Sequence, residues 1–371
     1  MKAFDIPFLD LSRQDAELAA ELNEAFSLFL RRGIHVLGPE VSSLESEFAA
    51  FCGTSAGVGL ASGTDALLLA LKALGAQSGD EVITPALSAP PTAVAVSLAG
   101  AVPVYTDIDA TTLCIDPSLV AERITARSRF LLVVHLYGRM ADMGPLAAVA
   151  REHGLILLED CAQAHGAAVS GKAAGTWGRA GSYSFYPTKN LGAYGDGGMV
   201  VTDDAGLAER LRSLRDYGRI DRDRLGEIGF NSRLDELQAA LLRVKLGHLE
   251  RWNRRRRELA RRYLEGLDGL PLRLPRWDGG EEHCFHLFVV ECEEREALRS
   301  HLEERGIQAA VHYPVPLHRQ PPYRDGGAPP RSFPVTERVA AQALSLPLYP
   351  YLREDEQERI VEAVRDFFGV S

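Results

Sequence analysis

Short apolar runs alternate with longer segments of helical period along the chain as far as residue 203. Seven runs bounded by glycine, proline or polar residues predict strands: AGVGLAS (56–62), EVITPA (81–86), VPVYTDI (102–108), FLLVVHLYG (130–138), LILLEDC (155–161), GSYSFYP (181–187) and GGMVVTD (197–203). Helical segments such as TDALLLALKALG (64–75) and MGPLAAVAREHG (143–154) separate most of them. Strands that alternate with helices form mainly parallel sheets covered on both faces. The pattern therefore predicts an α/β fold with a mainly parallel seven-stranded sheet.

A different pattern begins at Leu234. LDELQAALLRVKLGHLERWNRRRRELARRYLEGL (234–267) keeps a helical period with few breakers, which predicts one long helix. After it, CFHLFVVE (284–291), EREALRSHLEERG (294–306), IQAAVHYP (307–314) and EDEQERIVEAVRDFF (354–368) mix short strands with helices. We predict a large α/β domain over residues 1–245, with the N-terminal segment included. The long helix joins it to a smaller α+β domain over residues 246–371.

The charge balance bears on the choice of partner. The 371-residue chain has a formal net charge of −10. Phosphate backbones and anionic lipids need a basic face, so neither nucleic acid nor a membrane is expected as the main partner. One basic segment, RWNRRRRELARR (251–262), interleaves its arginines with Trp252, Leu259 and Ala260 at helical spacing. We predict that these arginines form the solvated face of an amphipathic helix.

Several features bear on the cellular compartment. The N-terminus has acidic residues and a proline where a signal peptide needs a basic start and an unbroken apolar core. Residues 83–105 carry no charge, but four prolines would break a membrane-spanning helix, so a strand, a helix and a strand are predicted. The five cysteines are scattered and form no C-x-x-C pair, which favours neither a disulfide framework nor a zinc site. A cytoplasmic protein without a metal is expected.

One lysine lies in a segment that is otherwise suited to burial. Lys189 belongs to SYSFYPTKNLGAYGDGGMVV (182–201), where an aromatic strand precedes it and a second apolar strand follows. Lysine is rarely buried without a partner, so burial of Lys189 would indicate a chemical role. In open α/β sheets, ligands bind beyond the carboxyl ends of the strands. The polar residues at those ends are therefore considered together with Lys189.

Two further groups lie at predicted strand ends. Ser62, Gly63 and Thr64 begin a predicted helix, where free N–H groups and the helix dipole favour a phosphate, although an ordinary N-cap explains them as well. Glu159 and Asp160 end a predicted strand. Alternation sends their side chains to opposite faces, so at most one of them faces a given pocket. Such a carboxylate can equally cap the next helix.

A phosphate cradle, a carboxylate and an amine together match the needs of pyridoxal 5′-phosphate (PLP). The amine forms a Schiff base, and the carboxylate keeps the pyridine nitrogen protonated so that the ring acts as an electron sink. GVGLASG (57–63) also resembles part of a dinucleotide-binding fingerprint, but its third glycine comes one residue late and no convincing ribose-binding acid follows. A nicotinamide-dependent oxidoreductase therefore remains as an alternative from another class.

Longer blocks carry a resemblance to a known family. SGTDAL, EDCAQAHGA, SFYPTKNLGAYGDGG, LRDYG, GFNSRLDELQAA and YPVPLH resemble the signature blocks of the DegT/StrS nucleotide-sugar aminotransferases, which are PLP enzymes of fold type I. VHLYGRMADM, AQAHGA and SFYPTKNLG most resemble the branch that aminates 3-keto-6-deoxyhexoses carried on dTDP. The resemblance implies transfer of an amino group from glutamate to a keto-deoxysugar nucleotide in deoxyaminosugar biosynthesis. A C4-specific aminotransferase of the same family and a non-catalytic, PLP-binding regulatory relative remain as alternatives.

The resemblance also implies roles for individual residues. Lys189 would be the Schiff-base lysine and later the proton shuttle, and Asp160 would hold the pyridine nitrogen. Gln163 would contact the hydroxyl side of the ring. The residues implied at the phosphate are Gly63, Thr64, Ser184 and, from the other subunit of a homodimer, Asn231.

Three residues are implied near the sugar nucleotide, and one position departs from the family pattern. Tyr217, Tyr313 and His318 would lie near the substrate, although each can equally be a packed aromatic or a surface histidine. The family usually places an aromatic residue after P-x-x-T/S to stack on the cofactor, and this chain has Ala89 there. The stacking ring is therefore absent at that position.

The segment GFNSRLDELQAALLRVKL (229–246) predicts a homodimer with shared active sites. Asn231 and Arg233 precede the long helix, where a loop can reach a neighbouring subunit. The apolar stripe that follows comprises Leu234, Leu237, Leu241 and Leu242. This stripe can pack against a second copy or, equally, within its own chain.

Overall fold

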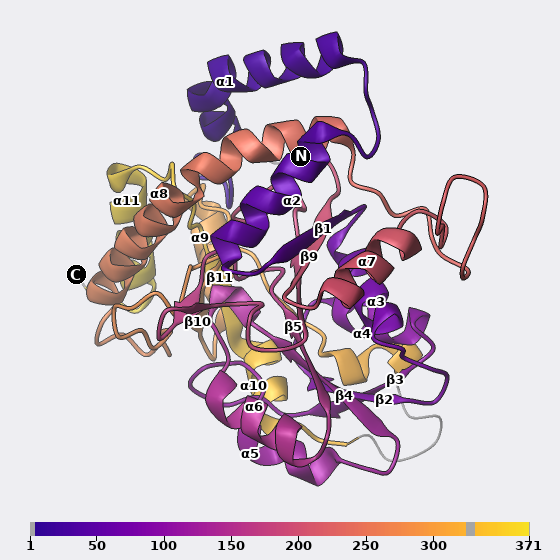
Figure 1. Ribbon diagram of the computed structural model, residues 1–371. Coiled ribbons are helices and arrows are strands. Elements are labelled where there is room, and N and C mark those ends of the chain that lie inside the picture. Colours follow the sequence, from indigo (N-terminus) through magenta and orange to yellow (C-terminus); the bar gives the residue numbers. More distant parts are fainter. Residues whose placement is uncertain (1–3, 324–330, 371) are drawn as a thin grey trace.

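A seven-stranded sheet is the centre of the molecule, whose computed structural model describes residues 4–323 and 331–370 (Figure 1). The strand order is β1-β9-β8-β5-β4-β2-β3. The strands are β1 (Ala56–Leu60), β2 (Glu81–Pro85), β3 (Val102–Thr106), β4 (Ser128–Val134), β5 (Ile156–Asp160), β8 (Ala180–Ser184) and β9 (Gly198–Thr202). Strand β9 is antiparallel to both of its neighbours, and the remaining pairs are parallel. The predicted mainly parallel sheet is confirmed.

The remaining elements are helices and two small two-stranded sheets. The small sheets pair β6 (Ala168–Val169) with β7 (Lys172–Ala173), and β10 (Phe288–Glu291) with β11 (Ala343–Leu346). The α-helices are α1 (Leu11–Arg32), α2 (Pro39–Cys52), α3 (Gly63–Ala73), α4 (Pro90–Leu98), α5 (Pro117–Val120), α6 (Met143–Glu152), α7 (Ala205–Leu214), α8 (Glu236–Gly266), α9 (Arg295–Glu304), α10 (Pro334–Gln342) and α11 (Glu354–Phe367). The 3₁₀ turns are η1 (Ala121–Arg123), η2 (Leu136–Gly138), η3 (Leu317–Arg319) and η4 (Pro321–Tyr323).

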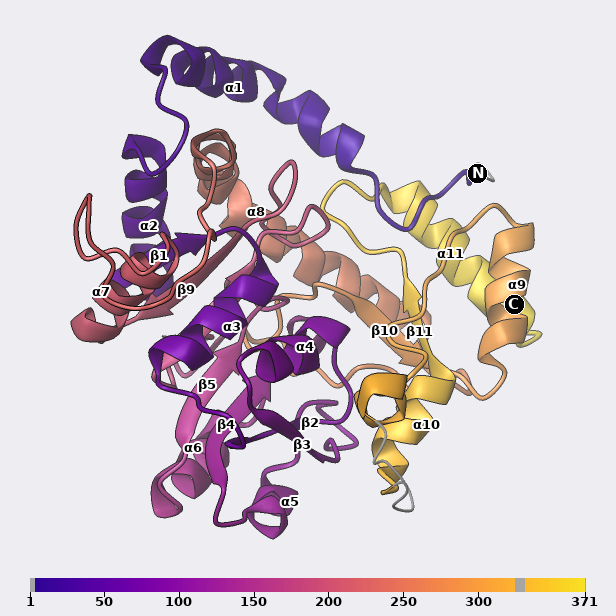
Figure 2. The same ribbon diagram turned by 90° about the vertical axis from the view of Figure 1, so that its right-hand side faces the viewer.

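Helices cover both faces of the sheet because its strands bury side chains on both sides. Along β4, Leu131 and Val133 enter one core cluster, whereas Phe130 and Leu132 enter another. The first cluster is shared with α2, α6 and the beginning of α8, and the second with α3, α4 and α7. Figure 2 shows α3, α4 and α7 together on one side of the sheet. The segment 83–105 is a strand, a helix and a strand, as predicted.

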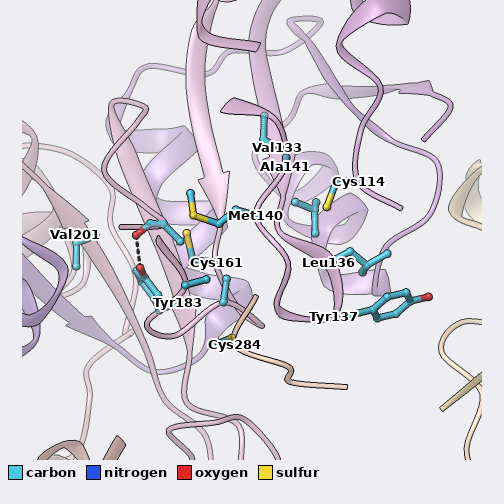
Figure 3. Close-up of a cluster of buried hydrophobic side chains, with 14 of the residues drawn as sticks. Cys114, Val133, Leu136, Tyr137, Met140, Ala141, Cys161, Tyr183, Val201 and Cys284 are labelled. Atoms are coloured by element: carbon cyan, nitrogen blue, oxygen red, sulfur yellow. Dashed lines mark hydrogen bonds between the residues drawn. The ribbon is translucent and has the colours of Figure 1, made fainter. Parts of the chain in front are cut away.

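The first of these clusters continues beneath the carboxyl ends of β4 and β5. Figure 3 shows Leu136, Met140, Cys161, Tyr183 and Cys284 among its side chains. The Tyr183 hydroxyl donates a hydrogen bond to the carbonyl oxygen of Ala174, so its polar end is satisfied inside the core. All five cysteines are buried and carry free thiols. No helix in the described part of the chain is long and apolar enough to cross a membrane.

The long helix α8 runs from the sheet to a third core cluster. Leu259 and Tyr263 of α8 pack there with β10, β11, α9 and α11. Ile6 joins the same cluster, because its N–H donates to Gly306 (3.0 Å) and its carbonyl oxygen accepts from Gln308 (2.9 Å). The N-terminal segment therefore lies against the C-terminal part of the chain, as Figure 2 shows. The predicted domain boundary at residue 245 falls within α8 and stays a prediction.

The basic segment of α8 is only partly the solvated face that its sequence predicts. Arg251 and Arg254 are exposed, and Arg251 forms an ion pair with Glu17 of α1, which lies over α8 (Figure 1). Arg256 is buried instead, and its guanidinium donates to the carbonyl oxygens of Phe285, His286 and Leu348. Burial lowers the pKa of Arg256 to about 10. This arginine holds together loops of the C-terminal part, a role that helical spacing alone does not distinguish from solvent exposure.

Candidate active site

A cavity of about 280 Å³ lies at the carboxyl ends of the parallel strands. Six of the residues predicted to bind a cofactor line it: Gly63, Thr64, Asp160, Gln163, Ser184 and Lys189. They come from the start of α3, the end of β5 and the turn after β8. The position of strand ends grouped Gly63, Thr64, Asp160 and Lys189, and the family resemblance added Gln163 and Ser184. The six line one cavity although they are far apart in the sequence, and their roles at a cofactor stay predictions.

The start of α3 and the end of β8 meet closely at one wall of this cavity. The Ser62 hydroxyl accepts from the Asp65 N–H (3.1 Å) and so caps α3. A Cβ atom on Gly63 would lie 2.4 Å from the Cβ of Ser184, so only glycine permits this approach. The N–H groups of Gly63 and Thr64 belong to the first helical turn, where no intrahelical carbonyl is available. These N–H groups and the Ser184 hydroxyl make a wall suited to an anion.

Asp160 occupies the floor of the cavity. Its Oδ1 accepts from the Ala162 N–H (3.1 Å), and its Oδ2 accepts from the Thr92 hydroxyl (2.9 Å). Burial raises the pKa of the Asp160 carboxyl, while these two hydrogen bonds and the nearby Lys189 oppose the rise. The carboxylate is thus buried, partnered on both oxygens and near the lysine.

Glu159 points to the opposite face of β5, as strand alternation predicts. It accepts from the N–H groups of Gly175, Trp177 and Gly178. His135 lies 3.0 Å away, and its Nδ1 accepts from the Ala141 N–H, so its Nε2 carries the proton that is donated to Glu159. With Cys161, these donor atoms lie within 4.8 Å of one another, a spacing that a metal site could have. The hydrogen bonds already use both ring nitrogens and both carboxylate oxygens, so they account for the cluster.

Lys189 lies in a tight turn between β8 and β9. Its backbone N–H donates to the Tyr186 carbonyl oxygen (2.8 Å), and the residue lines the cavity. Lys189 is half-buried rather than fully buried, which differs from the burial that its sequence context suggested. Desolvation still lowers the pKa of Lys189 to about 8, although the charge of Asp160 opposes the shift. Gly192 is required by the turn itself, since its Cβ would lie 2.2 Å from the Pro187 carbonyl oxygen.

Gln163 connects the cavity to Tyr313. Its Oε1 accepts from the Tyr137 N–H (2.6 Å), so its Nε2 is the donor to the Tyr313 hydroxyl (3.0 Å). Because Tyr313 accepts this bond, its own O–H can donate elsewhere. Burial raises the pKa of Tyr313 to about 12, so the hydroxyl stays protonated at neutral pH. The predicted residues Gln163 and Tyr313 are therefore neighbours.

Tyr313 contacts Gln163 but does not line the cavity, and neither do three other predicted residues. His318 borders a separate cavity of about 710 Å³ beside β3, and its Nε2 lies 3.2 Å from Glu337. Tyr217 is 40% exposed, with the guanidinium groups of Arg219 and Arg233 over its ring. Asn231 is exposed.

The segment around Asn231 lies beside α3 of its own chain. The neighbouring Ser232 accepts from the Ala61 N–H (3.2 Å) and donates to Asp65 (2.7 Å). Asn231 therefore lies close to the predicted phosphate wall along the chain path, but outside the cavity lining. Which subunit's cavity it serves stays a prediction.

Sequence reasoning missed several residues of the cavity. Tyr186 is an aromatic residue in the lining that was not expected there, whereas Ala89, which the family pattern placed beside the cofactor, does line the cavity. Ser88 and Thr92 also line it, from the loop after β2 and the first turn of α4. The signal for Thr92 was the proline pair before it, which fixes the start of a helix at the carboxyl end of a strand. The pairing of Thr92 with Asp160 has no sequence signal.

Known proteins resemble this chain over nearly its whole length. A profile of the DegT/DnrJ/EryC1/StrS aminotransferase family matches residues 16–365. A dTDP-3-amino-3,4,6-trideoxy-alpha-D-glucose transaminase of Streptomyces venezuelae is 48% identical over 363 residues, which cover 98% of this chain and 96% of that protein. The crystal structure of S. venezuelae DesV in complex with a ketimine intermediate superimposes with a TM-score of 0.95, 46% identity and 100% of both chains covered. NtdA of Bacillus subtilis, solved with bound cofactor PMP, gives a TM-score of 0.92 at 33% identity and covers 100% of this chain and 86% of that one.

Proposed function

This chain belongs to the DegT/DnrJ/EryC1/StrS aminotransferase family, and we propose that it transfers an amino group from glutamate to a keto-deoxysugar nucleotide, with a dTDP-3-keto-6-deoxyhexose as the acceptor. The observation that carries this proposal is the placement of Lys189 and Asp160 in one cavity, beside a wall suited to an anion. The Streptomyces relative is named for a 3-amino sugar on dTDP, which supports the choice of nucleotide and ring position.

The cavity fits PLP by the chemistry of its donors. Gly63, Thr64 and Ser184 would hold the phosphate, because their N–H and O–H groups converge where a Cβ on residue 63 cannot fit. Asp160 would hold the ring nitrogen, and Gln163 the hydroxyl side of the ring. When bound, PLP supplies the electron sink that amino transfer requires. The NtdA relative, solved with PMP, supports this cofactor.

Lys189 would move the proton. With a pKa of about 8, a useful fraction of its amine is unprotonated near neutral pH. The Nζ atom would then move a proton between the substrate carbon and the cofactor within each half-reaction. Two hydrogen bonds favour the ionised form of Asp160, which would stabilise a positive partner in the cavity. Tyr313 can donate a hydrogen bond to the substrate from the Gln163 side.

A homodimer with shared active sites is the proposed working unit. The predicted leucine stripe does not support it, because Leu234, Leu241 and Leu242 are buried within their own chain. A different surface does. The exposed apolar side chains Phe26, Leu30, Ile34, Val36 and Leu37 follow one another from α1 to the start of α2. Val36 pairs with Asp235 by a backbone bridge, so this surface, the α1–α2 patch, adjoins the segment of Asn231.

The loop between α7 and α8 supports the same assembly. It projects from the body in Figure 1, and it exposes Ile220, Leu225 and Ile228, the last at 93%. Apolar side chains at such exposure indicate a surface that is covered in the working assembly.

We propose a cytoplasmic location for the enzyme, because its five buried thiols are unpaired.

The test is a direct assay of amino transfer. The protein is incubated with PLP, glutamate and a panel of 3-keto and 4-keto sugars carried on dTDP or UDP, and products are identified by mass and NMR. A 3-amino-6-deoxyhexose on dTDP is expected, with Lys189→Ala as the inactive control. Exclusive amination at C4 would favour the C4-specific alternative. No amination of any acceptor, by protein that holds PLP, would contradict the proposal and favour a regulatory relative.

A further inference from the structure

A chain of two hydroxyl groups ends at the carboxylate of Asp160. Thr92 Oγ1 lies 2.9 Å from Asp160 Oδ2, and Ser88 Oγ lies 2.7 Å from Thr92 Oγ1. Thr92 has no exposed surface and Ser88 has 2%, so bulk water does not compete for these bonds. Both residues come from the segment that follows β2, and Asp160 ends β5.

The direction of the hydrogen bonds follows from the charge of Asp160. An ionised carboxylate can only accept, so the Thr92 proton points to Asp160. Thr92 has a single hydroxyl proton, so Ser88 must donate to Thr92. The chain therefore runs one way, from Ser88 through Thr92 to Asp160, for as long as Asp160 is ionised. Each donor polarises the next and strengthens the bond to the carboxylate.

The backbone holds Thr92 rigidly in this position. Pro90 and Pro91 occupy the first turn of α4, and their rings fix two successive φ angles. The N-cap residue Ala89 has no side chain that could bond to the helix start. Thr92 is β-branched, so few rotamers are open to its hydroxyl inside a helix. The start of α4 therefore fixes the position of the Thr92 hydroxyl, whereas its partner Asp160 lies at the end of β5.

The two donors to Asp160 arrive on different oxygens. Ala162 N–H bonds to Oδ1 and Thr92 bonds to Oδ2, which stops the carboxylate from rotating. A carboxylate oxygen can accept two hydrogen bonds, so each oxygen keeps one free acceptor site. The cavity is the space into which these sites open, since Asp160 lines it together with Lys189.

We propose that Thr92, supported by Ser88, is a positioning residue that keeps the Asp160 carboxylate ionised and correctly oriented towards the cofactor. This inference rests on the proposed function for the role of Asp160. The hydrogen bonds from Ser88 through Thr92 to Asp160 join protein groups and do not depend on a cofactor. Thr92 touches the carboxylate and acts through it.

The charge state of Asp160 also depends on its other neighbours. Lys189 from the turn after β8 and His135 from the end of β4 favour the ionised form. Cys161 and Tyr313 lie near enough for the charge of Asp160 to raise the pKa of each. Because burial is the largest influence and raises the pKa of Asp160, loss of a hydrogen-bond donor should raise it further.

The first experiment uses cofactor-free protein and measures the carboxyl titration of Asp160 by carbon-13 NMR, assigned with Asp160→Asn. Thr92→Val removes the hydroxyl at nearly constant shape and should raise the titration midpoint by about one pH unit. Thr92→Ser keeps a hydroxyl and should restore most of the wild-type midpoint. An unchanged midpoint in folded Thr92→Val overturns the proposal.

Ser88→Ala keeps the proposal testable if Thr92→Val fails to fold. It leaves Thr92 in place but removes the donor behind it, so a smaller shift in the same direction is expected. An unchanged Asp160 titration midpoint in folded Ser88→Ala would then contradict the proposed chain of hydrogen bonds.

The second experiment separates this inference from the proposed function. PLP is added to each variant, and the absorption band above 400 nm is followed against pH. A raised Asp160 midpoint with an altered pH dependence of this band supports the proposal. A raised midpoint with no band in any variant, wild type included, keeps the hydroxyl chain and contradicts the cofactor. A normal absorption band with an unchanged Asp160 midpoint in the variants contradicts the proposed chain of hydrogen bonds and leaves the proposed function intact.

Discussion

At the scale of the residue, the cavity depends on Lys189 and Asp160, two groups of opposite charge. Burial and the neighbouring charge have opposing effects on the ionisation of each group. Desolvation disfavours the charged form of both Lys189 and Asp160, while each favours the charge of the other. The lysine is therefore able to lose its proton near neutral pH, whereas two hydrogen-bond donors and the charge of Lys189 oppose the rise that burial causes in the pKa of Asp160. This balance makes both residues sensitive to single substitutions.

Lys189→Ala should abolish amino transfer and leave the fold intact. Loss of the proton-transferring amine should lower turnover by at least about 10²–10⁴-fold, the usual contribution of general acid–base catalysis. The residue lines the cavity, so the melting temperature should change little. Thr188→Ala, at the exposed neighbouring position, is the matched control and should keep its activity. Borohydride reduction and peptide mapping of wild-type protein should place the cofactor on Lys189, and a different lysine would contradict the assignment.

The reaction of Lys189 with PLP should depend on pH with a midpoint of about 8. Below that pH the amine is protonated and cannot attack, and above it the neutral form dominates, so the rate of colour formation should rise as the pH passes through this midpoint. Asp160→Asn removes the charge that favours protonated Lys189, so the midpoint should fall. The same substitution should lower turnover by orders of magnitude. A midpoint near 10.5, the ordinary lysine value, would show that Lys189 is not desolvated.

The residues found from the sequence alone share a simple property. Gly63, Asp160 and Lys189 lie directly at the ends of predicted elements, so the strand-end principle is enough to group them. Thr92 and Ser88 contribute through a hydrogen bond across 68 positions of sequence, which periodicity cannot reveal. His318 was placed near the substrate by a motif, yet in this chain it borders another cavity. Motifs give residue types, but side-chain direction depends on packing.

At the scale of the element, the end of β5 is fixed by a network behind the cavity. Glu159 accepts three backbone hydrogen bonds from residues 175–178 and one from His135. The strand therefore cannot shift without breaking bonds to a fully buried charge. Strand alternation predicted that the two acids would separate, but it did not predict which face would hold the cavity.

Glu159→Gln should destabilise the fold more than it affects chemistry. The amide can no longer accept with both ends, so at least one buried N–H or the His135 proton loses its partner, at about 1–3 kcal/mol each. Urea unfolding measures the loss. Glu250→Gln, on the exposed face of α8, is the control and should change stability by less than about 0.5 kcal/mol. Equal stability of the two variants would contradict the network.

The elements themselves were largely predictable. The seven strands follow from apolar runs between turn residues, and the long helix from its unbroken period. The burial of Arg256 was not predictable, because its partners are three carbonyl oxygens of distant loops. The leucines after Asn231 illustrate the same limit, since an apolar stripe does not state whether its partner is the same chain or another.

At the scale of the whole molecule, shared active sites can be tested by mixing subunits. Lys189→Ala and Asn231→Ala subunits should each be nearly inactive alone. If Asn231 serves the cavity of the partner, one site of each mixed dimer carries both intact residues, and activity should return to roughly half that of a wild-type dimer. Subunit exchange is verified by native mass spectrometry. Exchange without any recovery would assign Asn231 to the cavity of its own chain.

The apolar α1–α2 patch gives an independent test of assembly. Leu30 is 57% exposed, and Leu30→Glu should weaken a dimer that buries it while leaving the monomer folded. Sedimentation should show a lower molecular mass and circular dichroism an unchanged helix content. Glu24→Gln, a polar change on the exposed face of α1, is the control. An unchanged mass for Leu30→Glu would remove this patch from the interface.

The pairing of the N-terminal segment with the C-terminal part also delays when this segment can fold during synthesis. The Phe8 N–H donates to the side chain of Gln308, 300 positions later, and Ile6 lies beside Ile307. At about 5–20 residues per second, the ribosome needs about 15–60 s to supply that partner. The apolar residues Ile6, Phe8 and Leu9 would remain throughout this interval without their native contacts. Chaperones that bind nascent chains would therefore find a target in the apolar residues 6–9.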